Sequence, residues 1–304
     1  MALDTQAQNP VLNPNFVPAL ALLCNALIWG LSWWPLRLMF DAGLHPLWAT
    51  TLMFALIATA MLLLRPAARQ RLLRTPGLWL LMLTAGMTNV AFNWAITIGD
   101  VVRVVLLFYL MPAWAVLLAW RFLGERPSGW ALARLLLAFA GVALVLWPAG
   151  GGMQHLAADF SLADALAVLG GFMFAANNVL LLRLRSEPTQ ARVLAMFAGG
   201  AVAGLAVAGA SHALGLVPGL PAPGAAWLVP VLAWAAVLVL ANWALQFGAT
   251  RLPSGTTSLV MLSEILFATA SSVLADAASP TTATWAGGVL IVLAALLAAV
   301  QRRE

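Results

Sequence analysis

Lysine is absent from the 304-residue chain, and cysteine occurs only once, as Cys24. A single cysteine excludes an intrachain disulfide and does not indicate a redox compartment. Charged residues of both signs make up only 8% of the sequence, whereas soluble domains carry roughly 25%. This shortage excludes a single large water-soluble core. The net charge of +5 comes from arginine alone. Because the arginines lie between apolar runs, we expect them to set membrane topology and not to bind nucleic acid.

The sequence motifs of common membrane enzymes are also missing. No Gly-x-Ser-x-Gly or His-Glu-x-x-His segment occurs, and His45, His155 and His212 fall at loops or at the ends of apolar runs. Gly99-Asp100 resembles half of an aspartyl protease dyad, but no second membrane aspartate accompanies it. No nucleotide-binding loop occurs. We therefore expect no enzymatic activity, no cofactor and no metal, and ATP-driven transport by this chain alone is not expected.

Long apolar stretches fill most of the chain instead. Hydrophobic residues make up 63% of the sequence, and the mean hydropathy is +0.96. A bilayer core needs about 20 apolar residues per helix. Residues 1–16 are polar without a basic segment, which favours a cytoplasmic N-terminal tail over a cleaved signal peptide. The fold class predicted is an all-α integral membrane protein with ten transmembrane helices, at residues 17–38, 46–64, 77–98, 101–123, 128–147, 162–182, 190–212, 225–248, 255–275 and 283–300.

The arginines are distributed unevenly over the predicted connections. One side of the membrane receives only Arg37 and Arg103, together with aspartates. These two either guide an anionic group or pair with Asp41 and Asp100. Because cytoplasmic loops are enriched in arginine and lysine, the other side is the cytoplasm and both termini are expected there. The arginines on the cytoplasmic side are Arg65, Arg69, Arg71, Arg74, Arg121, Arg126, Arg183, Arg185, Arg192, Arg251, Arg302 and Arg303.

One short motif occurs twice, half a chain apart. The tripeptide Asn-Trp-Ala stands at residues 93–95 and again at 242–244, and each copy is followed four residues later by glycine. This pattern predicts two five-helix repeats, at residues 17–150 and 151–304. Because five is an odd number, the second repeat enters the membrane in the opposite orientation. In secondary transporters such inverted repeats place the substrate site at their interface near mid-membrane.

These features resemble a known family. The five-plus-five runs, the short loops and a fourth run that reads Leu-Met-Pro at 110–112 and Leu-Gly-Glu-Arg at 123–126 resemble the EamA-type members of the drug/metabolite transporter superfamily. The segment 108–112 and the Asn-Trp pair of the eighth run are most similar to YddG-type aromatic amino acid exporters. The second repeat departs from the family pattern, because Glu264 is followed by isoleucine where the family often has proline. The resemblance implies an amino acid exporter in the inner membrane of a bacterium.

Polar and aromatic side chains within the apolar runs are the candidates for a substrate site. Asn25, Trp29 and Trp33 follow one another at four-residue spacing, on one face of a helix. An unpaired amide in hydrocarbon is costly, so we expect such faces to look inward. They either line a polar and aromatic cavity or form interhelical hydrogen bonds, which average about 0.6 kcal/mol each. The residues assigned to substrate binding are Trp29, Trp33, Asn89, Asn93, Tyr109, Met111, Pro112, Asn177, Asn178, Asn242, Gln246 and Glu264.

Glu264 is the only acidic residue placed deep in an apolar run. Acids inside a membrane are costly and usually face a cavity or a partner. Three roles fit Glu264: a ligand for a substrate ammonium, a carrier of protons, or a structural acid satisfied by neighbouring backbone and side chains. The sequence does not decide among them.

The predicted function is secondary transport, by alternating access, that exports small organic metabolites, with aromatic or other hydrophobic amino acids as the preferred substrates. The expected partners are the substrate, the lipid bilayer and a proton as the candidate coupling ion. Two alternatives stay open. One is the efflux of cationic drugs or of another metabolite, and the other is a structural membrane protein that transports nothing.

Overall fold

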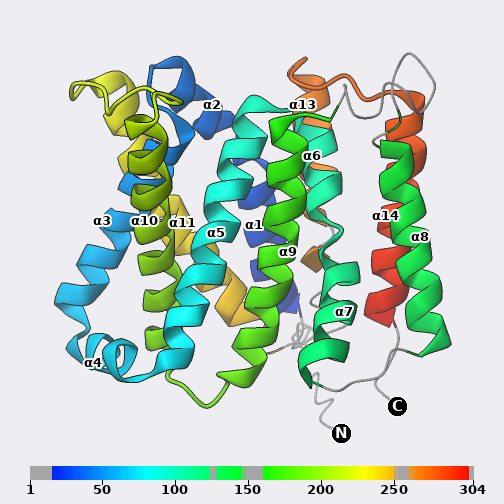
Figure 1. Ribbon diagram of the computed structural model, residues 1–304, viewed down its shortest axis with the longest axis horizontal. Coiled ribbons are helices and arrows are strands. Elements are labelled where there is room, and N and C mark those ends of the chain that lie inside the picture. Colours follow the sequence, from blue (N-terminus) through cyan, green and yellow to red (C-terminus); the bar gives the residue numbers. More distant parts are fainter. Residues whose placement is uncertain are drawn as a thin grey trace, which may run out of the picture.

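The computed structural model describes residues 16–123, 128–145, 147, 160–249, 251, 260–261 and 263–300. Every regular element in this part of the chain is an α-helix, so the predicted all-α fold is confirmed there. The helices run side by side and mostly upright in Figure 1. The predicted N-terminal tail, apart from Phe16, and the predicted boundary between the repeats at 150 and 151 lie outside the described residues.

Six segments of the described chain are long and apolar enough to cross a membrane. The first consists of α1 (Phe16–Gly30) and α2 (Trp33–Asp41) together, and the others are α3 (Pro46–Leu64), α5 (Pro76–Ile98), α9 (Leu162–Arg183), α10 (Thr189–Ala213) and α11 (Ala225–Ala249). The remaining helices are α4 (Pro66–Arg74), α6 (Val101–Phe108), α7 (Met111–Leu123), α8 (Gly129–Val145), α13 (Ser263–Leu274) and α14 (Thr282–Val300). The chain is thus a multi-pass membrane protein.

Two of the predicted runs are each divided into two helices, although the first still forms one segment that is long enough to cross a membrane. The run 17–38 divides at residues 31–32, and the run 101–123 divides at 109–110. A proline stands in the first turn after each break, at Pro35 and Pro112. Proline has no N–H to donate to the carbonyl four residues earlier, and its ring clashes with that carbonyl, but it fits the first turn of a new helix. Hydropathy does not reveal such breaks, because the run of apolar residues continues through them.

Glycines let several of these helices pack backbone against backbone. A Cβ atom on Gly199 of α10 would lie 2.1 Å from the carbonyl oxygen of Met82 in α5, and one on Gly86 would lie 2.3 Å from the carbonyl oxygen of Gly199. Gly141 of α8 and Gly287 of α14 approach each other's carbonyl oxygens in the same way. Small residues at such crossings are typical of membrane helices, whose association depends on close packing.

The surface helix α4 lies in the connection between α3 and α5, where the sequence predicted only a loop. Its Ala68 and Leu72 are buried among residues of α5 and α10, whereas Arg71 is exposed. The Nε and Nη2 atoms of Arg71 donate to the two carboxylate oxygens of Glu187 at 2.5 and 2.8 Å. These hydrogen bonds hold the pKa of Glu187 below its ordinary value. The ion pair ties the α3–α5 connection to the α9–α10 connection, and we expect salt to weaken it.

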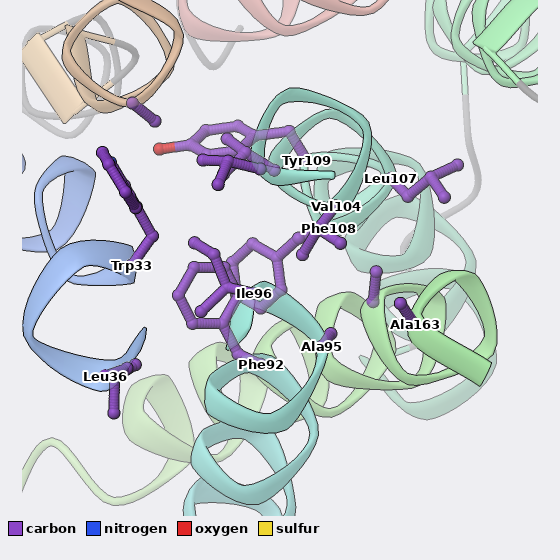
Figure 2. Packing of buried hydrophobic residues seen from close by; sticks show 14 of the residues in the cluster. Trp33, Leu36, Phe92, Ala95, Ile96, Val104, Leu107, Phe108, Tyr109 and Ala163 are labelled. Carbon is purple, nitrogen blue, oxygen red and sulfur yellow. The ribbon is translucent and has the colours of Figure 1, made fainter. Parts of the chain in front are cut away.

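The buried apolar core lies in the middle of the bundle. Trp33, Phe92, Phe108 and Tyr109 are among its residues, and Figure 2 shows their side chains between α2, α5, α6 and α9. The pair α8 and α14 stands at one edge of the bundle, with α3 and α10 at the other (Figure 1). The aromatic core therefore lies between these two outer pairs, as does the acid discussed next.

Candidate functional site

Two buried polar side chains meet where α6 and α7 are interrupted. The hydroxyl oxygen of Tyr109, in that interruption, is 3.0 Å from Oε2 of Glu264 in the first turn of α13. It is also 3.1 Å from the carbonyl oxygen of Met261. Tyr109 is 2% exposed and Glu264 is 7% exposed. The contact joins residues 155 positions apart, one from each predicted repeat.

The helices α1 and α2 run alongside α13 in the same direction. Gly30 makes the closest approach, because a Cβ atom there would lie 2.7 Å from Cβ of Phe267 and 3.0 Å from the carbonyl oxygen of Glu264. The side-chain contacts along this interface, in chain order, are Asn25 Nδ2 to Met261 Sδ at 3.5 Å, Trp33 Nε1 to Ser271 Oγ at 3.0 Å, and Arg37 Nη1 to the carbonyl oxygen of Ala277 at 3.3 Å. Asn25 and Trp33 therefore reach α13 on either side of Glu264.

Aromatic rings surround the Tyr109 side of the site. The ring centroids of Phe92 and Phe108 are 4.8 Å apart, and Phe108 contacts Tyr109 edge-on at 6.2 Å. Trp29 meets Phe92 edge-on at 6.3 Å, and Phe174 of α9 lies 5.5 Å from Phe108. In Figure 2 the rings of Trp33, Phe92, Phe108 and Tyr109 face a common region. A carboxylate beside such rings suits a solute that carries both a positive group and an apolar body.

Several buried polar atoms near the aromatic core have no hydrogen-bond partner among the described residues. On neutral side chains they are Oδ1 of Asn25, Oγ of Ser32, Oδ1 of Asn177 and Nε1 of Trp114, and Nε of Arg37 beside the Trp33 ring has no partner either. Buried polar groups are nearly always paired, so each of these atoms is a candidate contact for a bound molecule. Three of the four atoms on neutral side chains, all but the Trp114 nitrogen, are oxygens that can accept a hydrogen bond.

The amides of α5 are tied to their surroundings. Asn89 Nδ2 donates to the carbonyl oxygen of Ala85 on its own helix at 2.8 Å. Asn93, which is 3% exposed, donates from Nδ2 to Oγ1 of Thr50 in α3 at 3.1 Å. The Asn93 bond to α3 corresponds to the interhelical alternative that the sequence left open, whereas the Asn89 bond stays within α5.

The other predicted site residues are spread over the bundle. Asn177 is buried, whereas its neighbour Asn178 is exposed, because adjacent helical residues point about 100° apart. Asn242 and Gln246 of α11 are half-buried. Met111 is half-buried and packs against the aromatic core. Pro112 belongs to the first turn of α7, and its side chain lies outside the described residues.

The two copies of the Asn-Trp motif have different surroundings. Asn93 is buried, and Trp94 next to it is half-buried with its ring 5.4 Å from that of His45. In the second copy Asn242 is half-buried, while Trp243 is 61% exposed and stacks on Phe247 at 5.4 Å. The motif therefore identifies equivalent positions in the sequence without giving them equivalent contacts.

Arg103 pairs with a different acid from the one suggested by the sequence. The alternative that Arg103 pairs with Asp100 was wrong, because its Nε and Nη2 atoms donate to the carboxylate of Asp164, at the start of α9, at 2.7 and 2.9 Å. Asp100 instead caps α6 by accepting from the backbone N–H of Arg103 at 2.9 Å, and it also accepts from the backbone N–H of Ser279 at 3.3 Å. The carboxylate of Asp100 thus accepts hydrogen bonds from backbone N–H groups and not from the guanidinium of Arg103.

Arg37 makes no hydrogen bond to Asp41 in the described part of the chain, although the charges of Asp100 and Asp41 both attract its guanidinium. The guanidinium of Arg37 donates to the carbonyl oxygens of Gly99 at 2.6 Å and Ala277 at 3.3 Å, and it lies 5.5 Å from the ring centroid of Trp33. Arg37 thereby joins the end of α2 to the α5–α6 connection and to the segment after α13.

Sequence reasoning missed three contributors to this site. Asn25 was placed on the right helix face but not assigned to the site, although its amide contacts Met261. Phe92 and Phe108 gave no signal, because a phenylalanine within an apolar run is indistinguishable from ordinary core. No group of His, Cys, Asp and Glu that could hold a metal occurs in the part of the chain that the structure describes.

Residues 17–147 match the EamA-like transporter family. The resemblance to EamA-type transporters is thereby confirmed for this segment. The narrower likeness to YddG-type exporters stays a prediction. No curated protein matches the chain. A crystal structure of a protein that is 23% identical matches with a TM-score of 0.59, over 92% of this chain and 96% of that chain, so the two share a fold.

Proposed function

We propose that this protein is a secondary transporter that exports small organic solutes, with aromatic and other hydrophobic amino acids as its preferred substrates. The match of residues 17–147 to a transporter family supports transport. The observation that carries the proposal is the buried Glu264 and Tyr109 pair beside the aromatic rings of the core. A carboxylate fits the amino group of such a solute, and the rings fit its apolar side chain.

The proposed architecture has ten membrane spans in two inverted repeats, with both termini in the cytoplasm. In this arrangement α6 and α7 form the fourth span, and α13 belongs to the ninth. The packing supports it, because α1 of the first repeat lies along α13 of the second, just as α9 of the second repeat lies along α6 and α7 of the first. If the two repeats are exchanged, the contact of α1 with α13 becomes the contact of α9 with α6 and α7. The pairs α3–α10 and α8–α14 stay the same, because each pair joins corresponding helices of the two repeats. Such symmetry is what alternating access by inverted repeats requires.

Efflux of cationic compounds is the second candidate. The observation that favours it is the lack of a basic partner next to Glu264 among the described residues, since Arg37 and Arg103 are held elsewhere by carbonyls and by Asp164. A site with an acid and no base suits a cation without a carboxylate. Both candidates require transport, so one assay separates them from each other and from a protein with a purely structural role.

Counterflow in liposomes that contain only this protein tests the proposal. Liposomes loaded with unlabelled tryptophan are expected to accumulate labelled tryptophan faster than protein-free liposomes, because a transporter exchanges solute across the membrane. Labelled phenylalanine is expected to behave in the same way. If only a poorly permeant cation without a carboxylate, such as methyl viologen, exchanges faster than in protein-free liposomes, the second candidate is correct. If none of these solutes exchanges, transport of aromatic amino acids is refuted.

The proposed topology gives a separate prediction. Gln70 in α4 and Ala222 in the α10–α11 connection are both exposed, so a cysteine at either position is open to a thiol reagent. In a Cys24→Ala background, Gln70→Cys is expected to react with a membrane-impermeant maleimide only from the cytoplasm. Ala222→Cys is expected to react only from the other side. Reaction of both positions from one side would contradict the ten-span arrangement.

A further inference from the structure

The polar atoms around Glu264 contain more hydrogen-bond acceptors than donors. The hydroxyl of Tyr109 has a single hydrogen. Two acceptors lie within reach of it, Oε2 of Glu264 at 3.0 Å and the carbonyl oxygen of Met261 at 3.1 Å. When the hydrogen points to one of these two acceptors, no hydrogen of the hydroxyl lies between its oxygen and the other acceptor.

Asn25 adds a further acceptor to the same place. Its side chain is buried, at 1% exposure, and its Nδ2 atom lies 3.5 Å from Sδ of Met261. Its Oδ1 atom has no partner among the described residues. A buried amide oxygen without a donor costs free energy comparable to a lost hydrogen bond. The side chain of Asn25, whose amide nitrogen contacts Met261, therefore carries an acceptor for which the described residues supply no donor.

The described residues also supply no positive charge at this place. α1 carries no charged side chain, and the only one on α6, Arg103, pairs with Asp164. Arg37 of α2 is bound to the carbonyl oxygens of Gly99 and Ala277, beyond the far end of α13. Among the described residues, Glu264 is thus a buried acid on α13 with no cationic side chain bonded to it. An isolated buried charge is costly unless it is paired.

We infer that Asn25 Oδ1, the Met261 carbonyl oxygen and the Glu264 carboxylate form a binding site for a monovalent cation, with a primary ammonium group as the ligand. An ammonium group carries three N–H donors and no acceptor. It can therefore donate to the unpartnered Asn25 Oδ1 and to the two oxygens that share the single Tyr109 hydrogen. The aromatic rings next to Tyr109 would then contact the apolar part of the same molecule. This inference rests on the proposed transport function and adds Asn25 as a specificity-determining residue. Because a sodium ion also binds oxygen ligands, the experiment must distinguish a bound sodium ion from a bound ammonium group.

Binding of two related probes to the purified full-length protein tests the site. Tryptamine has an ammonium group and no carboxylate, whereas indole-3-propionate has a carboxylate and no amine. Wild-type protein is expected to bind tryptamine more tightly. Asn25→Leu keeps the size of the side chain and removes the acceptor, so it is expected to weaken tryptamine binding about tenfold or more. Indole-3-propionate binding is expected to stay unchanged.

A control variant and a second substitution keep this test decisive. Thr88→Val removes a buried hydroxyl that donates to the Thr84 carbonyl of its own helix, and it is expected to leave both affinities unchanged. If Asn25→Leu does not fold, Asn25→Asp is used, which keeps the shape, adds a negative charge and is expected to tighten tryptamine binding. Titration with sodium chloride against choline chloride distinguishes the sources. If sodium chloride abolishes tryptamine binding and choline chloride does not, the site is assigned to a sodium ion.

Two outcomes would overturn the inference. One is equal weakening of both probes by Asn25→Leu, which would indicate a general packing defect. The other is tryptamine binding that neither Asn25 variant changes. Counterflow of tryptophan in the same protein preparation is measured in parallel. Positive counterflow with either outcome would refute the ammonium site and leave the transport proposal standing.

Discussion

Glu264→Gln is expected to reduce tryptophan counterflow about tenfold to a hundredfold while the protein still folds, because a hydrogen bond to a charged group is worth about 1.5–3 kcal/mol. Glutamine keeps the shape of the side chain and can still hydrogen-bond the Tyr109 hydroxyl, 3.0 Å from Oε2 in the native protein. What it removes is the negative charge that would hold a substrate ammonium. The measurement is the initial rate of counterflow per folded molecule, normalised by size-exclusion chromatography.

The same variant separates the roles proposed for the acid. If Glu264 binds the ammonium, Glu264→Gln weakens tryptophan and tryptamine binding but spares indole-3-propionate. If Glu264 carries a coupling proton, the variant loses accumulation driven by a pH gradient and keeps passive exchange. Wild-type behaviour in both assays would leave the acid a structural role only.

Gly199→Val is expected to prevent folding or to destabilise the protein by about 3 kcal/mol or more. Any Cβ at residue 199 would lie 2.1 Å from the carbonyl oxygen of Met82 and 2.8 Å from its carbonyl carbon. These atoms belong to the backbone of α5, so no side chain can rotate away to make room. The helices α5 and α10 would have to separate, and the contacts along both would be lost. The measurement is the thermal unfolding temperature in detergent, together with the yield of monodisperse protein.

Gly209→Ala on the same helix is the matched control. A Cβ atom at residue 209 meets nothing within 4 Å, and the position is helical. Alanine is a better helix former than glycine by roughly 0.8–1.0 kcal/mol, so this variant is expected to be as stable as the wild type or slightly more so. Equal destabilisation by both substitutions would show that the close approach at Gly199 is not what the fold depends on.

The sequence predicted helix positions well because membrane helices depend on long apolar runs, which hydropathy measures directly. It did not predict the interruptions before Pro35 and Pro112, since the apolar character continues through both. Glu264 stood out, because an acid inside such a run is rare. Its partner Tyr109 was predicted as a site residue but not as a contact, because 155 residues separate the two and no local pattern records their pairing.

The roles of the amides were the least predictable part of the site. Asn25, Asn89 and Asn93 have the same side chain and occur in similar apolar surroundings in the sequence. The structure gives Asn89 and Asn93 protein partners for their donors, and it leaves the oxygen of Asn25 without one. Which acceptor lies opposite an amide depends on helix rotation and register, and these are set by packing contacts such as that of Gly30 on α13.

The close packing of Gly30 on α13 constrains how the bundle can move. Because Gly30 has no side chain, α1 and α13 pack closely, and together with α2 they form one closely packed unit. A second unit consists of α6, α7 and α9, because Gly171 packs on the Phe108 carbonyl oxygen and Arg103 holds Asp164. Side-chain hydrogen bonds join the two units at Tyr109 and, at one end, at Arg37 and Asp100. Among the described residues none joins them at the opposite end, so an opening of the bundle there would break no side-chain hydrogen bond between these residues of the two units.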